Sequence, residues 1–317
     1  MKYIKDYKEG DRMFDIYLCK HKQSAVTKNG KPYDNVILQD KTGTLDAKIW
    51  DPNSAGICEF SALDYIEVYG EVISFQGALQ VNVKRVRLCQ EGEYDPADYL
   101  PVSSKNIQDM YSELLGYIDS LQGRYVKSLL NAFFREDAEF VRAFQKSSAA
   151  KVIHHGFVGG LLEHTLSVVK LCDYYCTAYP ILNRDLLLAS AMLHDVGKTK
   201  EISPFPENDY TDDGQLLGHI VMGSEMVAEK VKQIQGFPAG MAAEIRHCIL
   251  AHHGKYEFGS PKLPALIEAL ALNYADDTDA KIQTFSEILN GARDGGWLGY
   301  NRLFESNLRR TRMEEGL

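Results

Sequence analysis

Apolar and polar residues alternate along the first 90 residues with the period of two that is typical of β-strands. The clearest run is 44–50, where Leu45, Ala47 and Ile49 fall on one face and Lys48 falls on the other. Four similar runs lie in the same region and are bounded by turn-forming residues, as in small all-β domains. We expect five strands, at 13–22, 33–39, 44–50, 65–75 and 79–88.

Turn-forming residues separate these runs. Asn29-Gly30 is the strongest two-residue hairpin signal in the chain, and Gln76-Gly77 joins the last two runs. Asp51-Pro52-Asn53-Ser54 ends the third run, and a short helix is expected between there and residue 61. Five strands with a short helix after the third is the order of an OB-fold, a small Greek-key barrel. Another small antiparallel barrel is the alternative.

A different pattern begins after residue 90. Residues 91–110 are polar and contain two prolines, as linkers do. From about residue 106 onward apolar residues recur at helical spacing, for example at Leu114, Leu115 and Ile118. The predicted fold is therefore multidomain: an N-terminal all-β OB-fold barrel (1–90), a linker (91–110) and an all-α domain (111–317).

Charge narrows the classes of partner. The chain of 317 residues carries a net charge of −9, with +1 in residues 1–90 and −10 in the rest. This balance argues against a duplex-DNA binder with a basic face, but not against a protein that holds single strands by stacking. The longest near-apolar run, 186–193, is too short for a membrane helix, which needs about 20 residues. The charged N-terminus lacks signal-peptide features, so we expect a cytoplasmic protein without membrane contact.

Histidines are concentrated in one part of the chain. Eight of the nine lie between residues 154 and 253. His194-Asp195 ends the apolar run 186–193, and Gly197 follows as an expected helix stop. Further polar residues flanked by apolar helical ones are His164, His219, His252, His253 and Asp276. Imidazoles and carboxylates that point inward from several helices predict a divalent-metal site, whereas His21 and His247 fit ordinary core histidines.

The order His164…His194-Asp195…Asp276 resembles the H…HD…D signature of the HD superfamily of metal-dependent phosphohydrolases. This resemblance implies that the four residues bind one metal and that Asp195 bridges to a second, held by His219 and His252. His253 would be a further ligand or a phosphate contact. The run that follows it, Gly254-Lys-Tyr-Glu-Phe, departs from the Gly-Tyr-Pro of cyclic-dinucleotide phosphodiesterases, which argues against that substrate.

The whole chain resembles the YhaM-type 3′→5′ exoribonucleases of Gram-positive bacteria. The matching segments are Leu38-Gln-Asp-Lys-Thr-Gly43, Lys48-Ile-Trp-Asp51, Gly159-Gly-Leu-Leu-Glu-His-Thr165 and Leu217-Gly-His-Ile220. The resemblance implies a cytoplasmic exonuclease with two divalent metal ions per chain, manganese first, with iron, cobalt, zinc or magnesium as alternatives. It also implies a homo-oligomer.

Candidate substrate contacts come from both domains. On the exposed strand faces we select Tyr33, Lys48, Trp50 and Phe75 as contacts to single-stranded RNA, with packing inside the barrel as the alternative. His154 and His155 precede the metal-binding helix and are further candidates. Lys198, just after the His-Asp pair, is expected to contact a phosphate oxygen, and we assign Asp195 and Lys198 as the catalytic residues.

The predicted function is hydrolysis of RNA from its 3′ end to nucleoside 5′-monophosphates, with single-stranded DNA as a further candidate substrate. A nucleotide phosphohydrolase is one alternative, but a mononucleotide does not need a strand-binding barrel. A nucleic-acid-binding regulator with a vestigial HD domain is another, but a decayed site should have lost at least one ligand.

Overall fold

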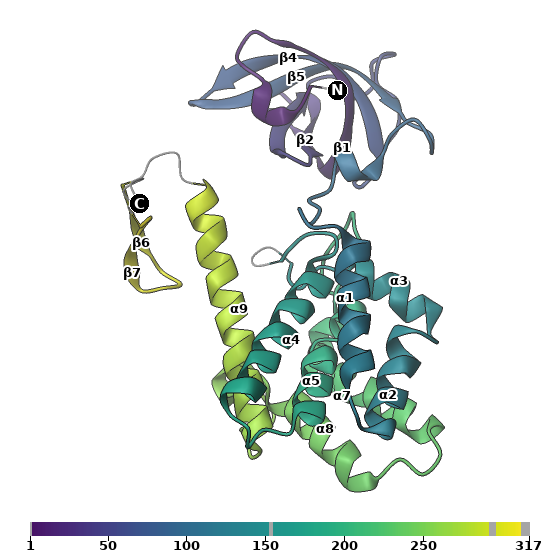
Figure 1. The fold of residues 1–317 in the computed structure, drawn as a ribbon. Helices are drawn as coiled ribbons and strands as arrows, with labels where there is room; N and C mark the ends of the chain where they lie inside the picture. Colours follow the sequence, from purple (N-terminus) through teal and green to yellow (C-terminus); the bar gives the residue numbers. More distant parts are fainter. Residues whose placement is uncertain (1, 152–154, 292–295, 312–317) are drawn as a thin grey trace. The chain divides into compact units, whose positions relative to one another are not determined.

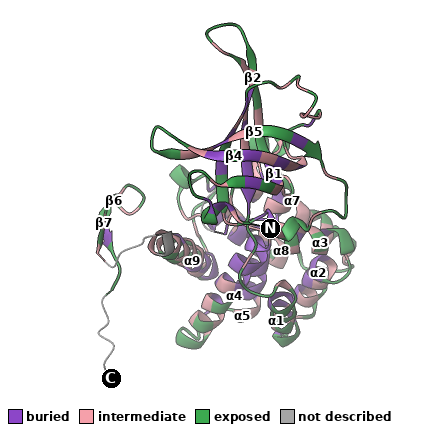
Figure 2. Cartoon of the chain, turned by 90° about the horizontal axis from the view of Figure 1, so that it is seen from above, coloured by how far each residue is buried: buried purple, intermediate pink, exposed green. Residues whose placement is uncertain are grey.

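The structure is a computed structural model that describes residues 2–151, 155–291 and 296–311. Its contacts divide the chain into two compact units, Met1–Ser104 with Ser203–Tyr210, and Lys105–Ile202 with Thr211–Leu317 (Figure 1). Buried residues line the inside of each unit (Figure 2). Among the described residues, no helix has both the length and the apolar character needed to cross a membrane. The predicted domain boundaries at 90 and 110 stay a prediction.

The first unit is a closed five-stranded barrel. Its strands are β1 (Arg12–Val26), β2 (Pro32–Asp40), β3 (Gly43–Ile49), β4 (Tyr65–Phe75) and β5 (Ala78–Leu88), with two short 3₁₀ helices, η1 (Ile4–Asp6) and η2 (Pro96–Asp98). They pair in the order β1-β2-β3-β5-β4, with β3 and β5 parallel and the other pairs antiparallel. This is the OB-fold barrel that the strand pattern predicts.

The apolar residues of β3 face the inside of the barrel, as the sequence pattern predicts. Leu45, Ala47 and Ile49 lie in the barrel core, and Trp50 is exposed. The short helix expected after β3 is absent from the fully described segment 51–64, which forms turns instead. Ile57 pairs with Val86 of β5, so this segment extends the sheet rather than coiling into a helix.

The second unit is helical. Its helices are α1 (Ile107–Ser120), α2 (Arg124–Phe134), α3 (Ala138–Lys146), α4 (Gly160–Ala178), α5 (Arg184–Leu193), α6 (Lys198–Glu201), α7 (Asp212–Gln233), α8 (Ala239–Ala251), η3 (Tyr256–Phe258) and α9 (Ile267–Gly291). Every side chain from Leu186 to Leu193 is buried, because α5 contacts α2, α4, α8 and α9. The Asn183 side chain caps this central helix by accepting a hydrogen bond from the amide of Leu186.

A β-hairpin follows α9 and corrects the expectation that the C-terminal part is entirely helical. Strands β6 (Trp297–Asn301) and β7 (Ser306–Arg309) pair antiparallel. The rings of Phe304 and Phe285 meet edge to face, with centroids 5.0 Å apart, and hold the hairpin against α9.

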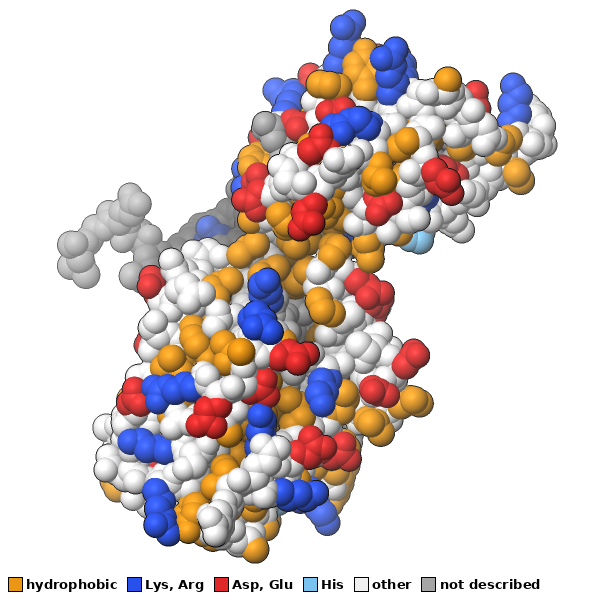
Figure 3. Space-filling view, turned by 90° about the vertical axis from the view of Figure 1, so that its right-hand side faces the viewer, with side chains coloured by type: hydrophobic (Ala, Val, Ile, Leu, Met, Phe, Trp, Pro, Cys, Tyr) orange, Lys and Arg blue, Asp and Glu red, His pale blue; other side chains and the backbone are white. Residues whose placement is uncertain are grey.

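In the face drawn in Figure 3, side chains of both charge signs are interspersed, so this face lacks the one-signed field of a duplex-DNA binder.

Candidate active site

Five helices bring the predicted metal ligands to one place in the second unit. His164 lies in α4, His194 and Asp195 directly follow α5, and His219 lies in α7. The others are His252 and His253 at the end of α8 and Asp276 in α9. Ligands that are 112 positions apart in the sequence thus become neighbours because the helices pack around α5.

Four of these residues form a first group. The Nε2 atom of His164 lies 3.2 Å from Nε2 of His194 and 3.2 Å from Oδ1 of Asp276. Oδ2 of Asp195 lies 3.5 Å from His164 Nε2 and 3.4 Å from His194 Nε2. One cation could contact all four atoms from this position, since imidazole nitrogen and carboxylate oxygen are common ligands of transition metals.

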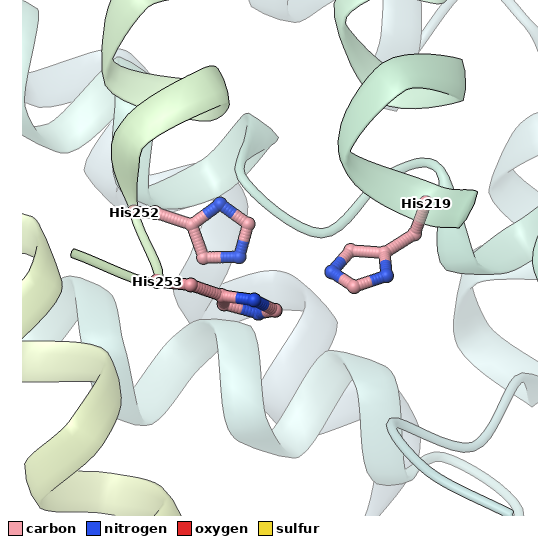
Figure 4. A group of neighbouring side chains, drawn as sticks. All are labelled: His219, His252 and His253. Atoms are coloured by element: carbon pink, nitrogen blue, oxygen red, sulfur yellow. The ribbon is translucent and has the colours of Figure 1, made fainter. Parts of the chain in front are cut away.

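The second group consists of His219, His252 and His253, whose side chains point toward one another in Figure 4. The other oxygen of Asp195, Oδ1, lies 3.4 Å from Nε2 of His219 and 3.7 Å from Nε2 of His252. Asp195 therefore presents one oxygen to each group. A carboxylate in this position can bridge two metal ions.

Each imidazole is turned by a hydrogen bond from its far nitrogen. Because carbonyl and carboxylate oxygens only accept, Nδ1 donates in every case and Nε2 is left for a metal. Three of the Nδ1 atoms bond backbone carbonyl oxygens, and two bond carboxylates. The partners are Ala191 for His194, Ile249 for His252, Phe258 for His253, Asp279 for His164 and Glu201 for His219.

Three buried atoms at the centre have no hydrogen-bond partner: Asp195 Oδ1, His219 Nε2 and His252 Nε2. Leaving such atoms unsatisfied costs free energy of the order of 1–3 kcal/mol each. All three face the same point between α5, α7 and α8, and a divalent cation there would satisfy them together. The residues present therefore fit a metal in the second group as well as in the first.

The carboxyl groups are held in their charged form. Burial by itself would raise the pKa of Asp195, but the Lys198 ammonium and the His194 imidazole outweigh it and lower that pKa well below its usual range. Burial likewise opposes the ionisation of Asp276, and the hydrogen bond with His164 and the electrostatic interaction with His194 reverse this and lower its pKa. Both groups are therefore ready to bind a cation at neutral pH.

The two ligand groups differ in the pKa of a histidine, that of His252 being lowered and that of His164 raised. Burial and the nearby His253 lower the pKa of His252 well below its ordinary value, so that this ring is neutral. Burial also lowers the pKa of His164, but hydrogen bonds with Asp276 and Asp279 outweigh it and raise that pKa to about 9. A cation that enters the first group must therefore displace a proton from His164.

Two supporting carboxylates were not identified from the sequence. Asp279 Oδ2 lies 2.7 Å from His164 Nδ1, and Glu201 Oε1 lies 2.9 Å from His219 Nδ1. Asp279 follows Asp276 by three positions, so helical spacing placed it on the same face and could have revealed it. No comparable signal marks Glu201.

Two glycines near the site have separate roles. Gly218 has a φ of 74° and a ψ of 156° inside α7, a conformation essentially confined to glycine, and the kink it makes precedes His219 directly. Gly197 has an ordinary φ of −62°, so it is not the helix stop that the sequence suggests. A Cβ there would lie 2.0 Å from the carbonyl oxygen of His219, and glycine is thus required for close packing of the two segments.

The first group opens into a cavity of about 1060 Å³, lined by His164, Lys198, His253 and Asp276 together with Lys255, Phe258, Tyr274 and Lys281. The Lys198 Nζ atom lies 2.6 Å from Oδ2 of Asp195. Two further lysines line the cavity, and each lies near a carboxylate: Lys281 Nζ is 2.7 Å from Asp277 Oδ2, and Lys255 Nζ is 3.5 Å from Glu257 Oε1. The three ammonium groups are donors that a phosphate in the cavity could reach.

Of the two other predicted histidines, the structure describes only His155, which is not among the residues that line this cavity. His155 is buried, and its Nε2 lies 3.0 Å from Oδ2 of Asp279, which places it behind His164 as part of that residue's support. His154 lies outside the described residues.

The structure brings together three of the four predicted contacts on the barrel. Tyr33 and Trp50 stack with ring centroids 5.4 Å apart, and the Lys48 ammonium lies 5.5 Å from the centroid of the Tyr33 ring. The indole N–H of Trp50 donates to Oδ1 of Asn82 on β5. Phe75 is exposed at the β4–β5 turn, separate from this cluster. An exposed aromatic cluster on the faces of β2 and β3 is where OB-folds bind oligonucleotides.

Comparison with known proteins relates the chain to a domain family and to an exoribonuclease. The HD domain family matches residues 161–281. The 3′-5′ exoribonuclease YhaM of Geobacillus sp. (strain WCH70) is 34% identical over 296 residues, which cover 92% of this chain and 89% of the relative.

Solved structures with similar parts include the second OB-fold domain of replication protein A from Methanococcus maripaludis, at 17% identity and a TM-score of 0.22. That match covers 29% of this chain and 98% of the other. A replication protein A heterotrimer bound to single-stranded DNA matches at 16% identity and a TM-score of 0.21, over 27% of this chain and 62% of that one. The relationship to YhaM extends over both units and rests on substantial identity, and the chain therefore belongs to the family of the 3′-5′ exoribonuclease YhaM.

Proposed function

We propose that this protein is a metal-dependent exoribonuclease that removes nucleoside 5′-monophosphates from the 3′ end of RNA. The observation that carries the proposal is Asp195, which presents one oxygen to each of two ligand groups in a chain that is related to YhaM along most of its length. A vestigial regulator is disfavoured because no member of either ligand group is missing. Action on single-stranded DNA, a homo-oligomer and a cytoplasmic location stay predictions.

Two divalent cations, with manganese as our first choice, would be held by the two groups. His164, His194 and Asp276 would hold one, His219 and His252 the other, and Asp195 both. When bound, such a pair of cations supplies Lewis acidity that activates water and neutralises charge on a phosphate. His253 would complete the second group or contact the phosphate.

The side chains around the centre would orient the end of the RNA strand. Lys198, which lines the cavity beside Asp195, would donate to a non-bridging oxygen of the scissile phosphate and so stabilise charge that develops there. Asp279 and Glu201 would keep the rings of His164 and His219 in the orientation that directs Nε2 to the centre. The barrel would hold the strand by base stacking on Trp50 and Tyr33, which tolerates any sequence.

His219→Ala should empty only the second group. His219 lies near Oδ1 of Asp195 and contributes no atom to the first group, so we expect elemental analysis to give about half the metal of the unchanged protein. His21→Ala is the matched control, because the structure places His21 on the barrel surface and not in the core as the sequence suggests. Full metal content in His219→Ala would contradict the assignment of two separate ions.

Digestion of end-labelled RNA tests the proposed function. The full-length protein loaded with manganese should shorten 5′-labelled RNA stepwise and release labelled mononucleotide at once from 3′-labelled RNA. A chelator should stop both reactions, and added manganese should restore them. Hydrolysis of free nucleotides with intact RNA would favour the nucleotide phosphohydrolase, and RNA binding with no hydrolysis under any metal would favour the vestigial regulator.

A further inference from the structure

The outer surface of β1, β4 and β5 carries a row of three side chains that the proposed function has not used. Phe14 pairs with Tyr69 across β1 and β4, and Tyr69 pairs with Arg85 across β4 and β5. We call Phe14, Tyr69 and Arg85 the aromatic row. Directly paired residues lie on the same face of a sheet, so the three side chains are neighbours on the barrel surface. Phe14 is 65% exposed, and its ring meets the ring of Tyr69 edge to face, with centroids 6.3 Å apart.

A bulge in β5 gives this row its charge. Tyr69 pairs with Arg85 whereas Gly70 pairs with Val83, so Lys84 is an extra residue in β5. The bulge turns both Lys84 and Arg85 outward, while Val83 and Val86 on either side stay in the core. A Cβ at position 70 would lie 2.7 Å from the carbonyl oxygen of Asn82, so the bulge requires glycine there.

The row encloses a hollow of about 610 Å³, lined by Phe14, Gly56, Glu67, Tyr69, Arg85, Val86 and Arg87. Arg87 is paired with Glu67 and Glu93, and Lys84 lies 3.8 Å from Glu71. In the part of the chain that the structure describes, no carboxylate lies within ion-pair distance of Arg85. The hollow therefore offers two aromatic rings and one guanidinium without an internal counterion.

The register connects this row to the group formed by Tyr33, Lys48 and Trp50, which we call the Trp50 cluster. Lys48 of β3 pairs with Asn82 of β5, Asn82 pairs with Glu71 of β4, and Glu71 pairs with Arg12 of β1. Asn82 also accepts the hydrogen bond from Trp50. Arg12 lies two residues before Phe14 on β1, and Glu71 lies two residues after Tyr69 on β4. Residues two apart on a strand are neighbours on one face of the sheet. The two surfaces are thus adjacent around the barrel and share β5.

We propose that single-stranded RNA continues from the Trp50 cluster across β5 onto the aromatic row, where bases stack on Phe14 and Tyr69 and a phosphate pairs with Arg85. The proposal rests on the proposed function, because it gives the same strand a longer path. Stacking on exposed rings beside an unpaired arginine is the chemistry by which proteins bind single strands. A protein partner is the less suitable occupant, because Val86, the one aliphatic side chain among the described residues that line the hollow, is buried, whereas the exposed side chains there are aromatic or charged.

Binding of two fluorescein-labelled RNAs tests this proposal. One has about 20 nucleotides, more than the roughly 4–16 that one OB-fold covers, and the other has about 4. Both are titrated into full-length protein under a chelator, so that no cleavage occurs. We expect Phe14→Ala and Arg85→Ala each to weaken binding of the long RNA roughly tenfold or more and to leave binding of the short RNA, held at the Trp50 cluster, nearly unchanged.

Substitutions at Phe14 separate stacking from apolar contact. Phe14→Tyr should bind the long RNA as the unchanged protein does, whereas Phe14→Leu should be as weak as Phe14→Ala. Lys20→Ala, which removes an exposed cation of β1 outside the row, is the control for Arg85→Ala. Trp50→Ala should weaken binding of both RNAs.

The outcomes separate this proposal from the proposed function. If Trp50→Ala weakens binding and the enzyme degrades RNA, but the Phe14 and Arg85 variants bind the long RNA normally, the aromatic row is not an RNA contact. If these variants change the molar mass in solution and not the RNA affinity, the row contacts protein and the proposal is overturned. If the unchanged protein neither binds nor degrades RNA, the proposed function itself fails.

Discussion

Asp195→Asn is expected to abolish nearly all RNA hydrolysis and to release metal from both ligand groups. The amide keeps the shape of the carboxylate but has no charge and only one oxygen, whereas each oxygen of Asp195 faces a different group. Loss of the bridge should lower the rate about a thousandfold or more, since positioned metal ions supply several kcal/mol of stabilisation to the transition state. Elemental analysis and digestion of end-labelled RNA measure the two effects on one preparation.

Asp277→Asn is the matched control for this variant. Asp277 is next to the ligand Asp276 and lines the same cavity, but it pairs with Lys281 and belongs to neither ligand group. It should keep the metal content and most of the activity, and circular dichroism should show helices in both variants. Turnover by Asp195→Asn at the rate of the unchanged protein would refute the two-metal assignment.

Lys198→Met should separate catalysis from metal binding. Methionine keeps the length and apolar stem of the lysine but cannot donate to a phosphate oxygen. We expect hydrolysis to fall by about 10²–10³-fold, the usual cost of removing one preorganised donor to a charged transition state. Metal content should be kept, because Lys198 contributes no ligand and its ammonium competes with a cation for Oδ2 of Asp195.

Lys200→Met tests whether any lysine of α6 would have this effect. Lys200 lies two residues further along the same short helix, is exposed, and does not line the catalytic cavity. Its variant should be fully active. If Lys198→Met is equally active, the lysine only neutralises Asp195; if it loses metal, the charge balance of the centre depends on Lys198 in a way that the proposed role does not explain.

The barrel could be predicted from the sequence because its signal is local. Alternation in β3 and the Asn29-Gly30 turn each depend on a few adjacent residues, and the structure has both, with Gly30 at a φ of 74°. The prediction of a short helix after β3 was wrong, because the structure of this segment depends on a distant contact. Its turn residues are visible in the sequence, but its pairing with Val86 of β5 depends on a residue that is 29 positions away.

The site residues, too, could be predicted only where their signal is local in the sequence. Histidines and aspartates in apolar helical surroundings could be recognised as candidate ligands, whereas Glu201 is defined only by its contact with a ring from another helix. Gly197 was noticed, but its role depends on the backbone of His219, which no local pattern encodes. The hairpin β6–β7 was missed because its aromatic residues have the spacing of neither a long strand nor a helix.

The order of the ligands along the chain has a consequence for synthesis. Asp276 and Asp279 both lie in α9, the last helix among the described residues, and without them the first ligand group has lost a carboxylate and the support of His164. A nascent chain that still lacks α9 therefore has neither carboxylate, and we expect it to hydrolyse no RNA. The strands of the barrel, by contrast, are all made by Leu88. Hydrolysis should therefore begin only after α9 has joined the other helices that carry ligands.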